Sequence, residues 1–373
     1  MSTFDRRRFL TIAGVGSLSA AASRTLAQEP APQPGRTGAP PSGGRPGGPP
    51  DGRGGTGRQG RPPYDPNAPL RVEIGRLRRL DPEFDRLADD GAVVERIANV
   101  EGNAEGPCWV PENGGYLVHS DPPMNVMWKW NPSDYSHTVF KKPSGFFGAD
   151  PDNVFREPGS NGIHYWKGSL IYADSGNRSV MRLDLKTMKT EVLADRFGDK
   201  RLNSPNDVTI ARDGTIFFTD PPYGLNGVAQ SKYVELDFHG VFRLGTDGEV
   251  TVVDRENQLV NGVALSPDGR TLYTCGGRNP RAAYDVDARN RVSNKRPFGV
   301  NESGGDGMKV DARGNLWCSG GPGLIIFNPA GKRIGVMETN LGASNCYFGD
   351  DGHIYITMGH SVGRVPVKVK GVA

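Results

Sequence analysis

The stretch that decides the fold is SPNDVTIARDGTIFFTDPPYG, from Ser204 to Gly224. Two short apolar runs flank the dipeptide Asp213-Gly214, which accepts the positive φ of a tight turn, so the stretch predicts a β-hairpin. Asn206 stands at the start of this hairpin and Asp220 at its end. Because a hairpin returns the chain to the edge it left, we expect Asn206 and Asp220 on one face.

The same pattern of polar residue, apolar run, glycine turn and second apolar run occurs six times along the chain. The copies start at Glu105, Asn161, Asn206, Asn261, Asp306 and Asn345. Their turn glycines are 38 to 55 residues apart, which leaves room for about four strands in each unit and is typical of propeller blades. The sequence therefore predicts an all-β fold, a six-bladed β-propeller with about four antiparallel strands per blade.

Composition agrees with a turn-rich β protein. The 373 residues include 52 Gly and 30 Pro, which is too many helix breakers for a mainly helical chain. The formal charge is +3, but residues 1–70 carry nine Arg and four acids, so the remainder carries −2. We expect no nucleic-acid partner, because the folded part has no large excess of positive charge.

The first 27 residues are predicted to be a twin-arginine-type signal peptide. Arg6-Arg7-Arg8 precedes a mild apolar run, and small residues follow it. This predicts recognition by the twin-arginine export machinery and a periplasmic or secreted location, with no membrane span in the mature protein. A general secretion signal or a cytoplasmic basic arm is the alternative.

Residues 28–68 are predicted to be a disordered Pro/Gly-rich linker, because they offer almost nothing to bury; a binding arm is the alternative. The propeller domain is then residues 69–373. Its last unit has room for only about three strands, so the run from Ala92 to Ala98 is predicted to supply the missing outer strand.

The four cysteines, at 108, 275, 318 and 346, form no CxxC pair. We expect four buried thiols; one disulfide is the alternative if the protein lies in an oxidising compartment.

In a propeller the first strand of each blade lines a central channel, so the six starting residues are expected at one mouth of that channel. They supply two carboxylates and up to four amides. Such oxygen ligands suit Ca²⁺ best and Mg²⁺ or Mn²⁺ next, whereas Zn²⁺ usually recruits His or Cys. The alternative is structural, since Asn and Asp often cap turns and a channel mouth is wet. Oligomeric state is not indicated.

Four motifs resemble a known family. EGPCW, SPNDV with TDPPYG, NGVALSPDGRTLY and DGMKVDARGNLW are similar to motifs of the gluconolactonase branch of the regucalcin (senescence marker protein) family of six-bladed propellers. The resemblance runs from about Leu70 to the C-terminus. It implies a metal-dependent lactonase with a small-molecule lactone as substrate. It also implies one divalent cation, Ca²⁺ before Mg²⁺, Mn²⁺ or Zn²⁺. The positions that match the family's metal site are Glu105, Asn206, Asn261 and Asp306.

Asp306 also matches the position proposed to act as base or water-orienting carboxylate. Further side chains are expected to contact substrate at the same mouth. These are Asn161, His164, Asp220, Tyr223, Asp121 and Asn345. Each has a structural alternative, because His164 can pack within its strand and the Asp-Pro-Pro segments that contain the two aspartates can simply fix their loops.

The chain departs from the family pattern beside these motifs. It has ADSGNR where EHGNR is common, Cys275-Gly276-Gly277 where an acidic or hydroxyl residue is usual, and Gly305 in place of a proline. The ligand set is kept while the pocket wall is altered. GxSxG and HExxH are absent, so serine-hydrolase and zincin chemistry are not expected. The alternatives to a lactonase are a hydrolase of other esters or phosphotriesters on the same scaffold and a non-catalytic periplasmic propeller with a structural ion.

Overall fold

The hairpin at Asp213-Gly214 forms as the sequence predicts. Strand β13 (Val208–Ile210) pairs antiparallel with β14 (Ile216–Asp220), with Val208 opposite Phe218. Gly214 has a φ of +101° and the Asp213 carboxylate accepts the Thr215 backbone N–H at 2.9 Å, which closes the turn. Asn206 donates its backbone N–H to the Thr219 carbonyl at 2.9 Å. The prediction that Asn206 and Asp220 lie at one edge is therefore confirmed.

This computed structural model describes residues 63–277, 279–299 and 304–372, all of which lie in one unit, Asp51–Ala373. The predicted signal peptide and residues 28–62 of the predicted linker lie outside the described residues. Residues 63–68 lie against the fold, because the Asn99 amide donates to the Ala68 carbonyl and the ring of Tyr64 contacts His360. These six residues of the predicted linker therefore belong with the folded unit.

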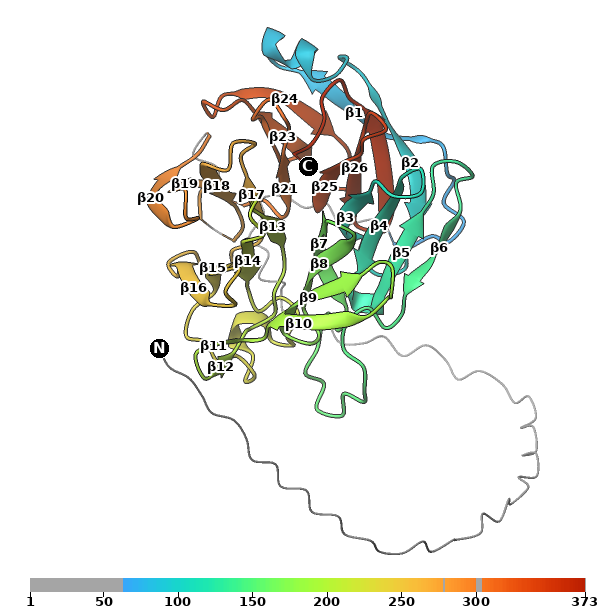
Figure 1. The fold of residues 1–373 in the computed structure, drawn as a ribbon. Helices are drawn as coiled ribbons and strands as arrows, with labels where there is room; N and C mark the ends of the chain where they lie inside the picture. The colour runs from blue at the N-terminus through green and yellow to red at the C-terminus, as the bar shows by residue number, and fades with distance from the viewer. Residues whose placement is uncertain (1–62, 278, 300–303, 373) are drawn as a thin grey trace, which may run out of the picture. The chain divides into compact units, whose positions relative to one another are not determined.

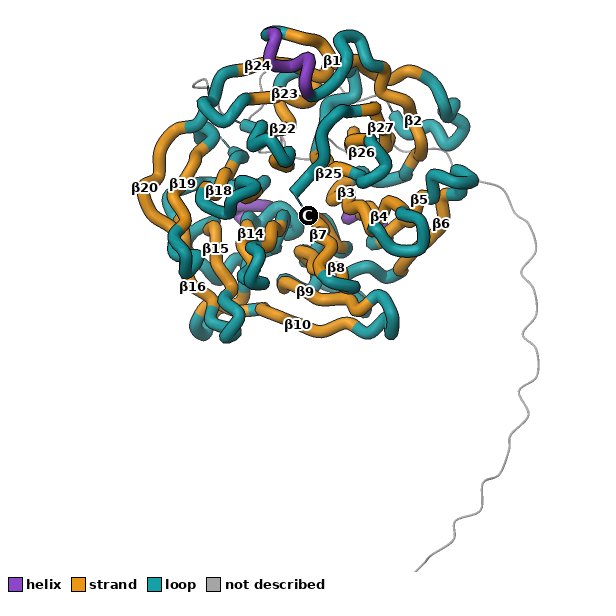
Figure 2. The backbone as a smooth tube through the Cα atoms, turned by 45° about the horizontal axis from the view of Figure 1, so that its top comes forward, coloured by secondary structure: helices purple, strands orange, loops and turns teal. Residues whose placement is uncertain are grey.

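Four of the sheets in the described part have four strands each, in meander order (Figure 1). They are β3 (Glu105–Val110), β4 (Tyr116–Asp121), β5 (Val126–Trp130) and β6 (His137–Lys141); β7 (Ser160–Trp166), β8 (Ser169–Asp174), β9 (Ser179–Asp184) and β10 (Thr190–Ala194); β13, β14, β15 (Gly240–Leu244) and β16 (Val250–Asp254); and β17 (Val263–Leu265), β18 (Thr271–Thr274), β19 (Ala282–Val286) and β20 (Val292–Pro297). Figure 2 shows these sheets placed around a centre, with β3 and β7 near it and β6, β10, β16 and β20 at the rim.

A nine-stranded sheet completes the arrangement. Its order is β21 (Met308–Val310), β22 (Leu316–Gly320), β23 (Gly323–Phe327), β24 (Arg333–Glu338), β1 (Glu73–Arg79), β2 (Val93–Asn99), β27 (Ser361–Pro366), β26 (His353–Met358) and β25 (Asn345–Phe348). Shorter elements are the two-stranded ribbon β11 (Arg196–Phe197) and β12 (Lys200–Arg201) and the 3₁₀ turns η1 (Pro82–Arg86), η2 (Pro122–Met124) and η3 (Val228–Gln230). Among the described residues, no helix is long and apolar enough to cross a bilayer.

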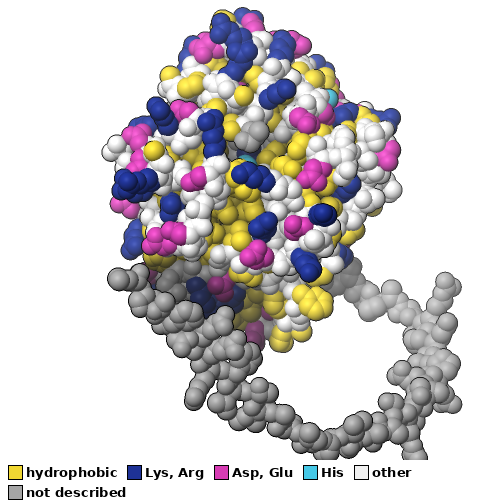
Figure 3. Space-filling model, viewed as in Figure 1, with side chains coloured by type: hydrophobic (Ala, Val, Ile, Leu, Met, Phe, Trp, Pro, Cys, Tyr) yellow, Lys and Arg dark blue, Asp and Glu magenta, His cyan; other side chains and the backbone are white. Residues whose placement is uncertain are grey.

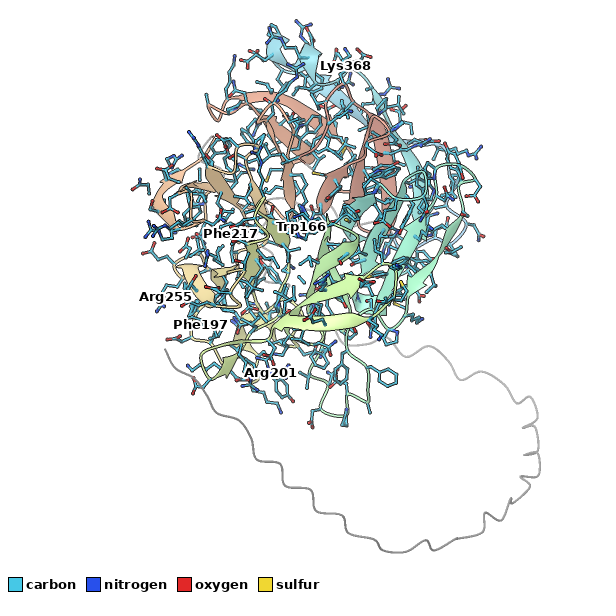
Figure 4. All side chains as sticks on the ribbon, viewed as in Figure 1. Trp166, Phe197, Arg201, Phe217, Arg255 and Lys368 are labelled. Atoms are coloured by element: carbon cyan, nitrogen blue, oxygen red, sulfur yellow. The ribbon has the colours of Figure 1, made fainter. Side chains whose placement is uncertain are left out.

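The core consists of apolar layers between successive sheets. Phe218 and Phe242 of one sheet stack at 5.2 Å and pack with Ala173 and Val180 of the preceding one, while Phe217 of the first sheet packs on its other side with Val263. In Figure 4, Phe217 lies in the interior, whereas Phe197, Arg201 and Arg255 lie toward the rim. Basic and acidic side chains are interspersed over the face shown in Figure 3. Burial on both sides explains why inner strands such as β3 and β4 are buried along their whole length.

An N-terminal strand pairs with the last unit. β2 pairs antiparallel with β27, with Glu95 opposite Arg364 and Asn99 opposite Ser361. The prediction that the segment from Ala92 to Ala98 supplies an outer strand is therefore confirmed. β1, which the sequence analysis does not predict, joins β2 to β24 and so connects the two halves of the nine-stranded sheet.

A histidine pair, in which His119 is buried and His137 is partly buried, lies on the first four-stranded sheet. His119 of β4 and His137 of β6 stack with ring centroids 5.1 Å apart, and their Nε2 atoms are 2.9 Å apart. One ring must be neutral to accept the proton of the other. Burial lowers the pKa of His137 to about 4, and burial and the facing His137 hold the pKa of His119 well below its usual range.

Closure by β2 predicts a contrast between two adjacent valines. Val94 is fully buried and Val93 is 38% exposed. We expect Val94→Ala to lower the free energy of unfolding by about 2 kcal/mol, through lost burial and a cavity, and Val93→Ala to change it by less than about 0.5 kcal/mol. Denaturant unfolding measures both, and equal losses would contradict the expected contrast between the buried and the exposed valine.

The histidine pair predicts acid sensitivity. Because both folded pKa values lie below the unfolded value near 6.5, the stability contribution is complete above pH 6.5 and is lost as pH falls toward 4. For His137 alone the loss at pH 5.5 is about 1 kcal/mol relative to pH 7.5. His137→Gln should lose correspondingly less than the wild type between these pH values in denaturant unfolding. An identical pH dependence of the two proteins would contradict the assignment.

Candidate functional site

The six polar residues of the repeat occupy equivalent places, each at the start of an inner strand. Glu105 begins β3, Asn345 begins β25 and Asn161 is the second residue of β7. Asn206, Asn261 and Asp306 each stand two residues before β13, β17 and β21. Glu105 and the four Asn are buried, and Asp306 is half-buried.

The return strands hold these residues at one edge. Glu105 lies opposite Ser120, and Asn345 lies opposite Thr357. The backbone N–H of Asn261 donates to the Cys275 carbonyl at 2.7 Å, and that of Asp306 donates to the Ser319 hydroxyl at 2.6 Å. Each polar residue is therefore fixed through its main chain, so that its side chain does not itself have to hold the strand in register.

Contacts between neighbouring inner strands join these residues into a ring. A Cβ on Gly106 would lie 1.9 Å from the Asn161 carbonyl oxygen, and Gly162 donates its N–H to the Asn206 carbonyl at 2.7 Å. On the other side, a Cβ on Gly307 would lie 2.0 Å from the side-chain Cγ of Asn345. A side chain at Gly106 or Gly307 would therefore clash with the next strand.

The remaining neighbours are joined by hydrogen bonds and close packing. The Val263 N–H donates to the Asp207 carboxylate at 3.3 Å, and a Cβ on Gly262 would lie 2.4 Å from the Asp306 carbonyl. The Ser344 hydroxyl donates to the Ala104 carbonyl at 2.8 Å, which connects the last unit to the first. The six inner strands β3, β7, β13, β17, β21 and β25 each contact the next, and β25 contacts β3. Glu105 and Asp306 thus belong to one continuous ring of contacts.

The donor chemistry of the ring fits a hard divalent cation. Glu105 and Asp306 supply carboxylate oxygens, and Asn206 and Asn261 supply amide oxygens, which are the ligand types that Ca²⁺ prefers. No cluster of three or more His, Cys, Asp or Glu suited to a metal ion occurs among the described residues. A site here therefore needs the amides as well as the two carboxylates.

Asp121 and Asp220 are engaged inside the protein. Both are fully buried. The Asp220 carboxylate accepts backbone N–H groups of Asn203 and Ser204 at 2.7 and 2.8 Å, and the Asp121 carboxylate accepts those of Gly102 and Asn103 at 3.1 and 2.9 Å. Burial raises the pKa of Asp220 to about 7, although these hydrogen bonds oppose the shift. Each carboxylate clamps the segment that leads into a ring residue.

The other four residues that were predicted to contact substrate have different surroundings. The Tyr223 hydroxyl donates to the Leu259 carbonyl at 2.8 Å, two residues before Asn261. The Asn345 side-chain oxygen accepts the Cys346 N–H at 2.8 Å. Asn161 stays in the ring, with its carbonyl accepting the Ser120 hydroxyl. His164, by contrast, lines a small cavity of about 40 Å³ together with Lys309 and residues at the far ends of the inner strands, so it lies farther along the channel than the ring.

Two residues that sequence reasoning missed support the ring directly. The Asn103 amide donates to Glu105 Oε1 at 2.9 Å, and both side chains are buried. The Lys309 ammonium lies 3.7 Å from the Asp207 carboxylate. Burial raises the pKa of Asp207, and Lys309 opposes that shift. The Asn-x-Glu spacing of residues 103 and 105 is the only sequence signal for the first contact, and the second has none.

Comparison with known proteins shows which family the chain resembles. The family described as "SMP-30/Gluconolactonase/LRE-like region" matches residues 103–360. A gluconolactonase of Zymomonas mobilis is 39% identical over 316 residues, which are 80% of this chain and 88% of that protein. A solved gluconolactonase structure from Xanthomonas campestris has a TM-score of 0.68 at 30% identity, covering 82% of this chain and 99% of that one.

A more distant relative is named for a different activity. The diisopropyl-fluorophosphatase of Loligo vulgaris is 26% identical over 167 residues, which are 40% of this chain and 53% of that protein. The family match spans most of the described fold and includes Glu105, Asn206, Asn261 and Asp306. The chain belongs to the SMP-30/gluconolactonase/LRE-like family.

Proposed function

We propose that the protein hydrolyses a sugar lactone at the mouth of the channel, as a gluconolactonase does. The observation that carries this proposal is the ring that joins Glu105 and Asp306 across the fold, in a chain 39% identical to a gluconolactonase over most of its length. We also propose that the fold is a six-bladed propeller, because the cycle of inner strands has six members.

The proposed metal ligands are Glu105, Asn206, Asn261 and Asp306, and the proposed ion is Ca²⁺, with Mg²⁺, Mn²⁺ or Zn²⁺ as alternatives. A divalent cation held there would polarise a lactone carbonyl and lower the pKa of a bound water. Asn103 holds Glu105 by donating to one carboxylate oxygen, Oε1, so that the orientation of the carboxylate is set before any ligand binds.

Asp306 is the proposed catalytic carboxylate. It is half-buried, and its backbone is fixed by the Ser319 hydroxyl and by the Cys275 thiol, which donates to the Asp306 carbonyl at 3.1 Å. In this position it orients the attacking water and accepts its proton. The new bond forms between water oxygen and the carbonyl carbon, and the ring C–O bond breaks. The ring oxygen then takes up the proton and leaves as a hydroxyl, without a covalent enzyme intermediate.

Substrate hydroxyls are proposed to meet Asn161 and Asn345 at the ring and Tyr223 at its edge. We assign Asp121 and Asp220 a positioning role instead of direct substrate contact, because their carboxylates accept main-chain N–H groups within the protein. His164 is proposed to line the channel below the substrate. Export by the twin-arginine route to the periplasm or exterior remains our proposal, and fractionation of cells that express a tagged chain tests it.

A second candidate is hydrolysis of other esters or phosphotriesters, favoured by the similarity to a fluorophosphatase over 167 residues. A panel of aldonolactones, aryl esters and phosphotriesters distinguishes it from a lactonase. The third candidate, a non-catalytic propeller with a structural ion, predicts no turnover of any of these compounds.

Removal of divalent cations is expected to abolish lactone hydrolysis. EDTA treatment followed by desalting should reduce turnover of glucono-1,5-lactone at least 100-fold, and added Ca²⁺ should restore it, because the ring then regains its counter-charge. Chelator-insensitive turnover would refute the metal role. As a second arm, Asp306→Asn should lower kcat by about 10²- to 10⁴-fold, whereas the control Asp247→Asn, at an outer turn, should leave kcat unchanged.

The contact between Asn103 and Glu105 predicts a specific loss of cation affinity. Asn103→Ala removes the amide donor but keeps the backbone N–H that binds Asp121, so the clamp is retained. We expect Ca²⁺ affinity, measured by calorimetry, to fall about 10- to 100-fold. The matched control is Asn131→Ala, at an outer turn between β5 and β6. Equal Ca²⁺ affinity of Asn103→Ala and wild type would contradict the positioning role.

A further inference from the structure

A long loop at the mouth, residues 221–239, joins two strands of one sheet. It leaves β14 after Asp220 and enters β15 at Gly240, and these two residues lie opposite each other in the sheet. Because Asp220 ends its strand at the edge that carries the ring, both ends of the loop start from that edge. Tyr223 stands near the first end of the loop and His239 at the second.

A single buried amide ties the two ends of this loop together. Asn203 is fully buried, and its side-chain amide donates to the Asp220 carbonyl at 3.0 Å and to the Phe238 carbonyl at 3.1 Å. The Ser204 hydroxyl accepts the Gly224 backbone N–H at 2.7 Å. The base of the loop is therefore fixed to the segment that leads into the ring in this unit.

From this base, two side chains reach the segment that leads into the next ring residue, Asn261. The Tyr223 hydroxyl donates to the Leu259 carbonyl at 2.8 Å, and the Nδ1 atom of His239 accepts the Leu259 backbone N–H at 3.4 Å. Tyr223 is 8% exposed and His239 is 9% exposed. Both the N–H and the carbonyl of Leu259 are thus held by the loop of the preceding unit.

The backbone conformation of Leu259 explains why it needs such support. Its φ is +58°, in the left-handed region that is unfavourable for a residue with a bulky side chain. Strained residues of this kind persist where the surrounding structure fixes them. On the other side, a Cβ on Gly276 would lie 2.4 Å from the Asn261 nitrogen, and one on Gly277 would lie 2.2 Å from the Gln258 carbonyl oxygen. These two glycines therefore bring a second segment directly against the turn.

We propose that Tyr223 and His239 are positioning residues for the cation site and act through Leu259. By holding its left-handed turn, they fix the position of the Asn261 amide relative to the Asn206 amide of the preceding unit. Both amides are proposed metal ligands, so this role rests on the proposed function. A site whose ligands are held in place before the ion arrives binds that ion more tightly, because less freedom is lost on binding.

Hydrogen exchange of the metal-free, full-length protein tests whether the Tyr223–His239 pair holds the turn. Tyr223→Phe removes one hydroxyl, and His239→Leu removes the acceptor but keeps a side chain of similar size. We expect each change to speed amide exchange in peptides that cover residues 257–262 by at least about fivefold, because the turn opens more often. His239→Asn supplies an oxygen near the position of Nδ1 and should exchange more slowly than His239→Leu.

The matched control lies in the same loop. Tyr233→Phe also removes a hydroxyl that donates to a carbonyl, in this case that of Asp152, and it should leave exchange in residues 257–262 unchanged. Peptides from the nine-stranded sheet should keep wild-type exchange in every variant, which excludes a general loss of stability. Wild-type exchange in residues 257–262 of Tyr223→Phe would overturn the proposal.

Ca²⁺ calorimetry tests the consequence for the ring. We expect Tyr223→Phe and His239→Leu each to lower Ca²⁺ affinity about 10-fold, with His239→Asn and Tyr233→Phe close to the wild type. No substrate is present, so a contact of Tyr223 with substrate does not contribute to this loss. Wild-type affinity in Tyr223→Phe and His239→Leu would overturn the positioning role. Absence of Ca²⁺ binding in the wild type would overturn the proposed metal site and this role with it, whereas exchange would still decide whether the pair holds the turn.

Discussion

The structure depends on the close approach of neighbouring inner strands at the axis. The place where a side chain on Gly106 would begin is taken by the carbonyl of Asn161, and the equivalent place at Gly307 is taken by the side chain of Asn345. Glycine is the residue that permits backbones to approach this closely. Without it the inner strands would move apart, and the ring of polar residues, in which Glu105 and Asp306 immediately precede these glycines, would widen.

The same approach explains why acids and amides gather at both ends of the hairpins. The ring residues begin the inner strands, while Asp121 and Asp220 end the return strands and accept main-chain N–H groups from the segments that lead into the ring. Those segments have no strand partner for these N–H groups, and a buried N–H without an acceptor is costly. Two carboxylates supply the acceptors. The polar residues therefore form two groups. Asp121 and Asp220 fix the backbone around the channel mouth, and the ring residues lie at the mouth itself.

Local signals predicted the hairpins, because Asp-Gly and Asn-Gly turns act over a few residues, and the incomplete last unit pointed to β2 as its outer strand. β1 escaped prediction, since its sequence EIGRLRR is mostly exposed and has little apolar alternation. The holding role of Asp220 and the contact of Asn103 with Glu105 also escaped prediction. Both depend on which groups burial leaves close together.

The ring residues are fixed by their main chains, so their side chains are not needed to hold the inner strands in register. Asn261 and Asp306 are held through N–H groups that donate to Cys275 and Ser319, so a change of side chain at either position leaves the strand anchored. One scaffold can in this way serve relatives named as a gluconolactonase and a fluorophosphatase. Which reaction a member performs then depends on the few side chains that the anchored backbone presents to the mouth.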